Sequence, residues 1–370
     1  MQNNISIETE DSARELRRGW TTGACATAAA KASYIGLLTG QIPSKVKITL
    51  PGGQKPDFLV KESHISKLAV MAAIEKDAGD DPDVTHGSVI RVSIRQSEKL
   101  TFKAGLGVGK VTKPGLPIKV GEPAINPGPR KMIEQNLQVV ADKYGGDLKI
   151  QIEISIDNGR KLAQKTWNPR LGIVGGLSIL GTTGVVIPYS CAAWIASIHQ
   201  GIDVARATGI KHVAACTGKT SEEAVTTLYK FEPSSILDMG DFVGGTVKYL
   251  RTNPISKVTI ASGFGKASKL AAGHMDLHSN RSQLNPNFIA SLAAKTGINK
   301  YICDQIARSE SAGNIIEIIE KYNLKLGDEI AKTAQAVVNE EINNNIDIEI
   351  LVYDRKGIQI GHAPFKTVKK

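Results

Sequence analysis

The fold of the second half of the chain is decided by the stretch Gly172-Ile173-Val174-Gly175-Gly176-Leu177-Ser178-Ile179-Leu180-Gly181-Thr182-Thr183-Gly184. A short apolar run leads into closely spaced glycines, and a helix-compatible segment follows. The same order returns further along the chain and is typical of a mostly parallel α/β sheet. The sequence therefore predicts an α/β domain with glycine-rich loops over residues 169–345. Its strands are predicted at residues 171–174, 213–216, 236–239 and 258–261, and its first helices at 190–207 and 221–229.

The chain before residue 169 has a different texture. Residues 1–15 lack periodic apolar side chains and are predicted to be a disordered tail. Thr21 and Thr22 precede a run of small residues, which predicts a capped helix. With short β-branched runs and a further helix at 130–144, these features predict an α+β domain over residues 16–168. Residues 346–370 are predicted to form a C-terminal β-hairpin, so the fold class is mixed α/β and α+β in two domains.

Composition limits the class of protein. The 370 residues are 41% hydrophobic, and no apolar run approaches the roughly 20 residues that cross a bilayer. The polar, acidic start is unlike a signal peptide, so the sequence predicts a cytoplasmic protein with no membrane partner. The four cysteines lie far apart without a Cys-x-x-Cys motif, and no protein-bound metal is expected.

The formal net charge of +10 favours anionic partners. Lysines and arginines are dispersed, aromatic residues make up only 5% of the chain, and no nucleic-acid-binding motif is recognisable. The sequence therefore predicts no nucleic-acid partner and leaves phosphates or a polycarboxylate as anionic partners that the charge would suit. A solvated basic surface is the alternative explanation of the charge.

Three glycine-rich loops after predicted strands are suited to bind a ligand through main-chain N–H groups. Ligands collect at the carboxyl ends of strands in open parallel sheets, so we expect these loops to line one site. Tight packing is the alternative explanation of such glycines. The residues in and beside these loops that are candidates for ligand binding are Gly175, Gly176, Gly181, Thr182, Gly184, Asp238, Asp241 and Gly263.

A fourth loop, Cys216-Thr217-Gly218-Lys219-Thr220-Ser221, resembles the end of a P-loop. It lacks the upstream glycine spacing of that motif, which argues against hydrolysis of nucleoside triphosphates. A helix start capped by Thr220 or Ser221 is the simpler interpretation.

Charged and histidine-containing motifs supply the remaining candidates. Arg17 and Arg18 precede the helix start at Thr21 and Thr22, where guanidinium groups and a helix dipole suit a carboxylate. The acidic loop Asp77-Ala78-Gly79-Asp80-Asp81-Pro82-Asp83 suits a cation, a cofactor hydroxyl or a solvated turn. In Gly273-His274-Met275-Asp276-Leu277-His278-Ser279 two histidines four apart fit one helix face, where they are suited to metal binding, to proton transfer or to structural roles.

Several long strings resemble the cobalt-precorrin-5B C1-methyltransferase family of anaerobic cobalamin biosynthesis. The resemblance is dense from Arg17 to about Leu284 and thinner thereafter. Strings of this length in the same order are more specific than a short glycine pattern. They are Arg18-Gly19-Trp20-Thr21-Thr22-Gly23, the acidic loop 77–83, the run 107–130 with Gly121-Glu122-Pro123-Ala124-Ile125-Asn126-Pro127, Thr166-Trp167-Asn168-Pro169-Arg170-Leu171-Gly172-Ile173-Val174-Gly175-Gly176, and residues 273–279.

The resemblance implies transfer of a methyl group from S-adenosylmethionine to C1 of cobalt-precorrin-5B, giving cobalt-precorrin-6A and S-adenosylhomocysteine. Cobalt would arrive inside the substrate. On this interpretation the glycine loops hold the donor, Asp238 or Asp241 contacts its ribose, and His274 or Asp276 removes any proton. The candidates for binding substrate carboxylates are Arg17, Arg18, Thr21, Thr22, Lys110, Arg130 and Arg170.

Two other functions remain open on the sequence. A nicotinamide-dependent corrinoid reductase would use similar glycine loops, although the Gly-x-Gly-x-x-Gly turn with its later acidic residue is missing. A noncatalytic tetrapyrrole or RNA binder would use the positive charge. A homo-oligomer is compatible with the sequence, which fixes no oligomeric state.

Overall fold

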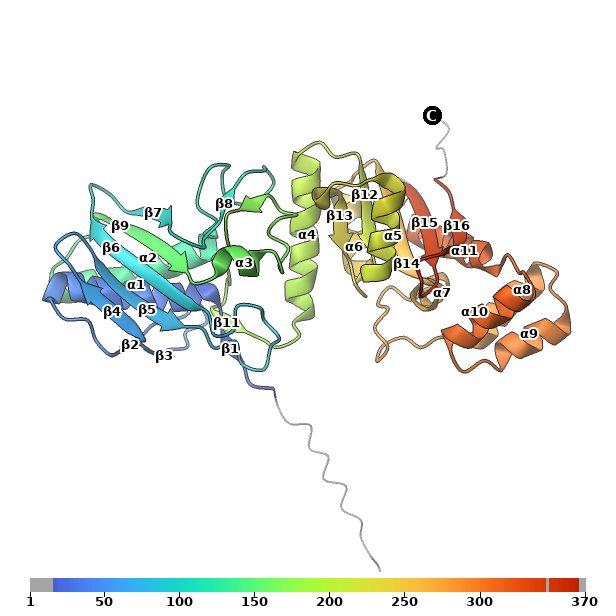
Figure 1. Ribbon diagram of the computed structural model, residues 1–370, viewed down its shortest axis with the longest axis horizontal. Coiled ribbons are helices and arrows are strands. Elements are labelled where there is room, and N and C mark those ends of the chain that lie inside the picture. Colours follow the sequence, from blue (N-terminus) through green and yellow to red (C-terminus); the bar gives the residue numbers. More distant parts are fainter. Residues whose placement is uncertain (1–15, 344–345, 366–370) are drawn as a thin grey trace, which may run out of the picture. The chain divides into compact units, whose positions relative to one another are not determined.

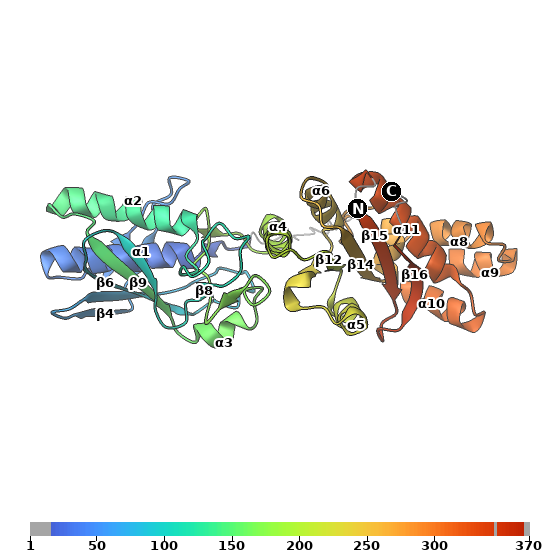
Figure 2. The same cartoon turned by 90° about the horizontal axis from the view of Figure 1, so that it is seen from above.

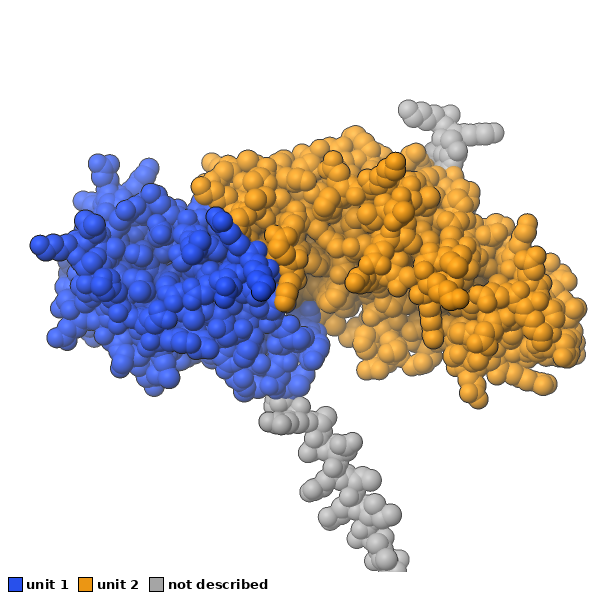
Figure 3. All heavy atoms as spheres, viewed as in Figure 1, with its two compact units in different colours: residues 1–108, 123–162, 177–190 blue, residues 109–122, 163–176, 191–370 orange. Residues whose placement is uncertain are grey.

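The computed structural model describes residues 16–343 and 346–365 (Figure 1). These residues combine helices with β-sheets, which confirms the predicted mixed α/β class. The predicted disordered tail lies outside the described residues. Two compact units share the chain, and Figure 3 colours them separately. Of the described residues, unit 1 holds 16–108, 123–162 and 177–190, and unit 2 holds 109–122, 163–176, 191–343 and 346–365.

Unit 1 is built on a five-stranded sheet with the order β4-β5-β6-β9-β7. All neighbouring pairs are antiparallel except β7 with β9. Apolar side chains alternate along the central strands, and Ile90, Val92 and Ile94 of β6 are fully buried. The strands are β4 (Glu62–Ile65), β5 (Val70–Glu75), β6 (Val89–Gln96), β7 (Thr101–Ala104) and β9 (Ile150–Ile156).

Helix α1 (Thr22–Thr39) packs against β5 and β6 of this sheet, and helix α2 (Pro127–Tyr144) lies beside α1 (Figures 1 and 2). Thr21 caps α1 as predicted, because its hydroxyl accepts a 3.2 Å hydrogen bond from Ala24 N. Gly40 ends the helix in a left-handed conformation, at φ +74°. The small residues of α1 are almost all buried, which lets the helix lie close to β5, β6 and α2.

Shorter elements complete unit 1. Within unit 1, β1 (Gly19–Trp20) pairs with β11 (Val185–Val186), and β2 (Lys45–Lys47) pairs with β3 (Asp57–Leu59). The short helix α3 (Gly159–Ala163) ends at the boundary between the two units.

Unit 2 contains a five-stranded sheet with the order β13-β12-β14-β15-β16. Every neighbouring pair is parallel except β15 with β16, so the predicted mostly parallel sheet is confirmed. The predicted C-terminal hairpin is present, and it forms the last two strands of this sheet. The strands are β12 (His212–Cys216), β13 (Ile236–Asp238), β14 (Lys257–Gly263), β15 (Asp347–Tyr353) and β16 (Gln359–Ala363).

Helices cover both faces of this sheet (Figure 2). On one face, α5 (Lys219–Tyr229) packs over a small core that includes Ala214, Ala261 and Leu351. The opposite face carries the main core and is covered by α4 (Cys191–Ala207), α6 (Val243–Thr252), α7 (Phe264–Ala271) and α11 (Leu326–Ile342). The 3-10 turn η1 (Pro233–Ser235) precedes β13, and the remaining helices are α8 (Pro286–Lys295), α9 (Lys300–Ala307) and α10 (Ala312–Lys321).

The predicted strand at residues 171–174 is wrong as a member of the parallel sheet. Only β10 (Ile173–Val174) is extended, and it pairs antiparallel with β8 (Lys110–Val111). Gly172 at φ +70° and Gly175 at φ +90° turn the backbone on either side, so the strand ends after two residues. The glycine stretch at 172–184 therefore does not follow a strand of the parallel sheet.

The predicted caps of α5 are also wrong. The helix begins at Lys219, so Thr220 and Ser221 lie inside its first turn, and Gly218 precedes it. Ser221 Oγ donates a 2.8 Å hydrogen bond to Gly218 O, and Gly218 lacks a side chain that could cap the helix. The first N–H groups of α5 are thus left without a side-chain cap from Gly218.

Candidate functional site

Part of the glycine stretch packs against the N-terminus of α1 in unit 1. Gly23 N donates to Leu180 O at 2.9 Å, and Leu180 N donates to the Thr22 hydroxyl at 3.0 Å. A Cβ on Gly181 would lie 2.3 Å from Thr21 atoms, and one on Gly184 would lie 2.6 Å from Leu50. Packing against Thr21 therefore requires glycine at 181, whereas at 184 the end of the Leu50 side chain can shift and the left-handed backbone, at φ +82°, favours glycine.

The candidate cofactor residues divide between the two units. Gly181, the exposed Thr182 and Gly184 belong to unit 1. Gly175 and Gly176 belong to unit 2, which also holds Asp238, Asp241 and Gly263. The expectation that all three loops follow strands of one sheet is wrong, because β10 pairs outside that sheet.

Arg17 is engaged by the acidic loop of unit 1. The Arg17 guanidinium forms a two-point ion pair with Asp77, in which Arg17 Nη2 lies 2.9 Å from Asp77 Oδ1. The main-chain N–H of Arg17 donates a hydrogen bond to Asp80 Oδ2 at 2.7 Å. The bond from Arg17 lowers the pKa of Asp77 to about 2. Arg18 is exposed and forms no ion pair among the residues that the structure describes.

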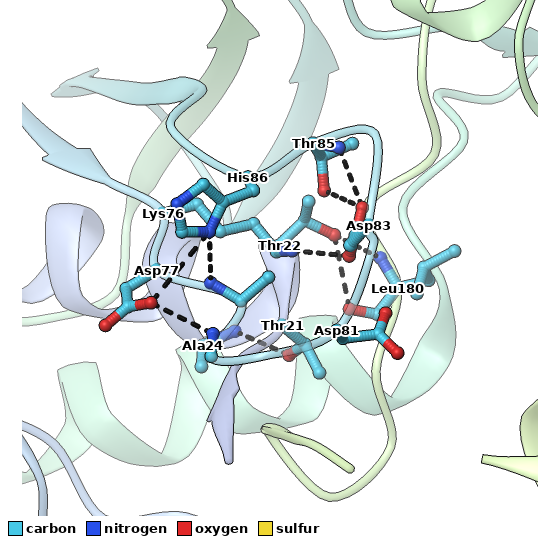
Figure 4. Close-up of polar contacts among 12 residues, drawn as sticks. Thr21, Thr22, Ala24, Lys76, Asp77, Asp81, Asp83, Thr85, His86 and Leu180 are labelled. Atoms are coloured by element: carbon cyan, nitrogen blue, oxygen red, sulfur yellow. Dashed lines mark hydrogen bonds and ion pairs between the residues drawn. The ribbon is translucent and has the colours of Figure 1, made fainter. Parts of the chain in front are cut away.

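The other carboxylates of the acidic loop also have protein partners (Figure 4). Asp83 accepts hydrogen bonds from Lys76 Nζ at 2.5 Å and from Thr85 N at 2.7 Å, and only 1% of the Lys76 side chain is exposed. Asp81 Oδ1 accepts from Tyr189 N at 2.9 Å. Within residues 16–343 and 346–365, no group of three or more His, Cys, Asp or Glu side chains could hold a metal ion. The carboxylates of this loop therefore bind other residues of unit 1.

The remaining candidates for binding substrate differ in their exposure and in their contacts with the rest of the protein. Arg130 Nε donates to Ile125 O at 2.9 Å, and its guanidinium lies 5.5 Å from the centre of the Phe102 ring. Lys110 is exposed on β8. Thr21 and Thr22 are buried and bonded at the start of α1, so among these candidates Lys110 remains most accessible to a ligand.

The segment with His274 and Asp276 is a loop. Helix α7 ends at Ala271, and Gly273 at φ +92° turns the chain away, so the expected shared helix face is wrong. Asp276 accepts from His278 N at 3.1 Å and pairs with Arg281 Nη1 at 2.6 Å. Burial acts to raise the pKa of Asp276, but these two partners outweigh it and lower the pKa. Asp276 is therefore held as a carboxylate, and His274 is exposed.

Charged side chains gather at the carboxyl ends of the parallel strands in unit 2. Lys266 Nζ donates to Thr217 O at 2.7 Å and lies 3.0 Å from Asp241 Oδ1, outside hydrogen-bond geometry. Arg170 Nη2 pairs with Glu222 Oε1 at 2.6 Å. Among the described residues, Arg170 Nη1 and Asp241 Oδ1 are buried atoms without a hydrogen-bond partner. Such atoms suit polar groups of a bound molecule.

Asp238 lies in the same charged group. Burial raises its pKa and Glu222 raises it further, while Arg170 and Lys266 act in the opposite direction. Its carbonyl oxygen accepts a 3.0 Å hydrogen bond from Trp194 Nε1, and the Trp194 ring stands about 3.5 Å from the position of a Cβ on Gly240. An aromatic face thus borders the charged group.

Comparison with known proteins places the chain in a family. It is 50% identical over 352 residues to the cobalt-precorrin-5B C(1)-methyltransferase of Paramagnetospirillum magneticum, covering 94% of this chain and 98% of that protein. The chain belongs to the CbiD family. The CbiD family model matches residues 9–188, and that of the CbiD C-terminal domain matches residues 276–364.

A second relative agrees with the CbiD assignment. The cobalt-precorrin-5B C(1)-methyltransferase of Brucella anthropi is 51% identical and covers 93% of this chain and 94% of its own length. A crystal structure of the cobalamin biosynthesis protein CbiD from Archaeoglobus fulgidus is 26% identical, with a TM-score of 0.40, over 76% of this chain and 85% of that one. None of the helices described in this CbiD-family chain is both long and apolar enough to span a membrane.

Sequence reasoning missed several residues of the strand ends in this CbiD chain. The predicted candidate residues include Asp238, Asp241 and Gly263. They do not include Thr217, Gly218, Lys266 or Trp194. The signal was present for Gly218, because it follows an apolar strand and precedes a helix. Lys266 and Trp194 carry no local signal, since their positions depend on contacts with Thr217 and Asp238.

Proposed function

We propose that this protein transfers a methyl group to C1 of cobalt-precorrin-5B. The observation that carries the proposal is the 50% identity, over nearly the whole of both chains, to a protein named for that reaction. Relatives of this similarity share their fold throughout, so a common reaction is the simplest account. The positive charge of the chain suits a substrate rich in carboxylates.

The proposed methyl donor is S-adenosylmethionine, and the product from it is S-adenosylhomocysteine. In the transfer, C1 supplies the electron pair of the new carbon–carbon bond, and the electrons of the broken carbon–sulfur bond stay on sulfur. Because the sulfonium is already a good leaving group, alignment of the two reactants supplies most of the catalysis. The protein then needs no nucleophilic side chain of its own.

The carboxyl ends of the parallel strands in unit 2 support a donor site there. Asp238 and Asp241 offer acceptors for ribose hydroxyls or an ammonium group, and Gly263 leaves open space beside them. Arg170 Nη1 and Asp241 Oδ1 are buried atoms that a polar ligand would satisfy. Of the candidates in the stretch 172–184, Gly175 and Gly176 remain compatible with this site, since they belong to the same unit.

For the substrate, the proposal rests on the basic residues that the fold leaves accessible. Arg18 and Lys110 are exposed and suit propionate or acetate groups of the corrinoid. Arg17, Arg130 and Arg170 make protein contacts, so their proposed role is secondary. His274 is exposed and remains the proposed acceptor of any proton, because Asp276 is paired with Arg281.

The reaction is tested under anaerobic conditions with purified protein, cobalt-precorrin-5B and donor carrying a radioactive methyl group. We expect label in the corrinoid, with one S-adenosylhomocysteine formed for each methyl transferred. A parallel reaction with NADPH in place of the donor should leave the corrinoid unchanged. Oxidation of NADPH without methyl transfer would replace this proposal by the reductase alternative.

A further inference from the structure

The order of the strands in unit 2 creates a point where the chain changes direction across the sheet. From β12 the chain passes through α5 to β13 on one side, and from β14 it passes through helices that begin with α7 and end with α11 to β15 on the other side. The connecting helices consequently lie on opposite faces. In open α/β sheets the carboxyl ends of two such strands are the usual place for a ligand.

Gly218 and Gly263 stand at the carboxyl ends of β12 and β14. The two strand ends are joined, because Thr217 N donates to Ala261 O at 3.0 Å and the hydroxyls of Thr217 and Ser262 lie 3.1 Å apart. We call Thr217, Gly218, Ser262, Gly263 and Lys266 the strand-end site.

Neither backbone conformation nor packing explains glycine at these two positions. Gly218 has φ 171° and Gly263 has φ −70°, which side-chain-bearing residues adopt freely. A Cβ on either residue would meet no atom within 4 Å among the described residues. By contrast, Gly181 needs a left-handed conformation and would collide with Thr21. The open space at Gly218 and Gly263 is therefore free for something other than this chain.

Both glycines also precede helices. Gly218 is the N-cap of α5 and Gly263 is the N-cap of α7, and neither helix receives a side-chain cap from its N-cap residue. The first N–H groups of both helices thus remain available to an acceptor, and both helix dipoles favour negative charge. Lys266, in the first turn of α7, adds a cation bonded to Thr217 O.

Carboxylates lie close to these donors. Asp241 Oδ1 is 3.0 Å from Lys266 Nζ, and Asp238 ends β13, the strand beside β12. The site therefore combines anion-binding N–H groups with acceptors for hydroxyl or ammonium groups. An amino acid joined to a nucleoside carries all of these groups in one small molecule.

We propose that the strand-end site binds the methyl donor, with its amino-acid carboxylate against the N–H groups that follow Gly218 and Gly263. The nucleoside hydroxyls lie toward Asp238 in this arrangement. The inference rests on the proposed function and deepens it, because it assigns the carboxylate of the donor to the N–H groups at the starts of α5 and α7. A carboxylate of the corrinoid has the same chemistry as that of the donor, so the experiment must separate the two sources.

The experiment is calorimetric titration of the full-length protein and of the variants Gly218→Val and Gly263→Val. The probes are S-adenosylhomocysteine, 5′-methylthioadenosine, which lacks the amino-acid part, and cobyrinic acid as a corrinoid polycarboxylate. Ala294→Val on α8 is the matched control, because Ala294 is exposed and lies in the same unit. Thermal unfolding of each variant checks that the fold is kept.

We expect wild-type protein to bind S-adenosylhomocysteine at least about tenfold more tightly than 5′-methylthioadenosine, since a carboxylate bonded to N–H groups contributes roughly this much. Both glycine variants should lose at least about tenfold in affinity for S-adenosylhomocysteine and keep their affinity for cobyrinic acid. The Ala294→Val control should match the wild type with all three probes.

Two results would overturn the inference while leaving the proposed function intact. The first is unchanged affinity for S-adenosylhomocysteine in stably folded Gly218→Val and Gly263→Val. The second is that these variants lose affinity for cobyrinic acid and keep their affinity for S-adenosylhomocysteine. Equal affinity of the wild type for the two nucleosides would overturn the assignment of the carboxylate. If the wild type bound no S-adenosylhomocysteine even with cobalt-precorrin-5B present, and transferred no methyl group, the proposed function itself would fail.

Discussion

Lys266 Nζ donates a 2.7 Å hydrogen bond to the carbonyl oxygen of Thr217, which ties the first turn of α7 to the end of β12. The bond holds the two strand ends together beside Gly218 and Gly263. The lysine also lies 3.0 Å from Asp241, so one cation orients both a main-chain oxygen and a carboxylate.

Replacing this lysine should weaken donor binding. We expect Lys266→Met to reduce affinity for S-adenosylhomocysteine about tenfold, because a charge-assisted contact near the ligand is removed. The matched control is Lys269→Met, since Lys269 on the same helix donates a 3.0 Å bond to Leu277 O. Titration calorimetry of both variants checks the prediction, and equal losses in the two would contradict it.

Gly181 should affect stability through packing in unit 1. Gly181 has φ +111° and Gly175 has φ +90°, but only Gly181 would bring a Cβ against Thr21. Gly175→Ala should cost about 1 kcal/mol of unfolding free energy from backbone strain, and Gly181→Ala roughly 2–4 kcal/mol because overpacking is added. Urea denaturation followed by circular dichroism measures the unfolding free energy of both variants. Similar losses of unfolding free energy in the two would contradict the predicted cost of the contact with Thr21.

The buried pair of Lys76 and Asp83 should be costly to break from one side. Only 1% of the Lys76 side chain is exposed, so Asp83→Ala leaves a buried charge and should cost about 3 kcal/mol or more. The double variant Lys76→Met with Asp83→Ala should be more stable than Asp83→Ala alone. Urea unfolding of the single and double variants tests this, and a double variant less stable than the single one would speak against it.

The ion pair of Arg17 and Asp77 should give a pH-dependent contribution to stability. The pKa of Asp77 is lowered to about 2, against roughly 3.9 for an unfolded chain, so the stabilisation is full above about pH 4 and is lost as pH falls through about 2. Both side chains are largely exposed, so Asp77→Asn should cost less than about 1 kcal/mol at neutral pH. Unfolding of wild type and variant between these pH values should show the difference shrink, and a constant difference would refute the assignment.

The sequence predicts elements whose signals are local. Thr21 caps α1 as its position before a small-residue helix indicates, and the apolar runs before Gly218 and Gly263 form parallel strands. Local patterns do not reveal which distant residue a segment meets. The pairing of β10 with β8, the contact of Gly181 with Thr21 and the bond from Lys266 to Thr217 all join residues 49 or more positions apart.

The candidate site also contains residues that local sequence signals predict and residues that only long-range contacts reveal. The sequence predicts Asp238, Asp241 and Gly263 as candidate residues because they follow apolar strands, and the structure places them in one unit. Gly181 and Gly184 have an equally strong glycine signal, but packing against Thr21 accounts for Gly181 and a left-handed backbone at φ +82° accounts for Gly184. A glycine in a sequence does not say whether the missing side chain makes room for a ligand or for the protein itself.

The central claim is methyl transfer to C1, and it is tested most directly by the position of the new carbon in the product. Cobalt-precorrin-5B is incubated anaerobically with the protein and S-adenosylmethionine labelled with ¹³C in its methyl group, and the corrinoid is examined by ¹³C NMR. The account predicts a single enriched methyl signal attached to C1. Enrichment at another ring carbon, or an unlabelled corrinoid with the donor unconsumed, would contradict it.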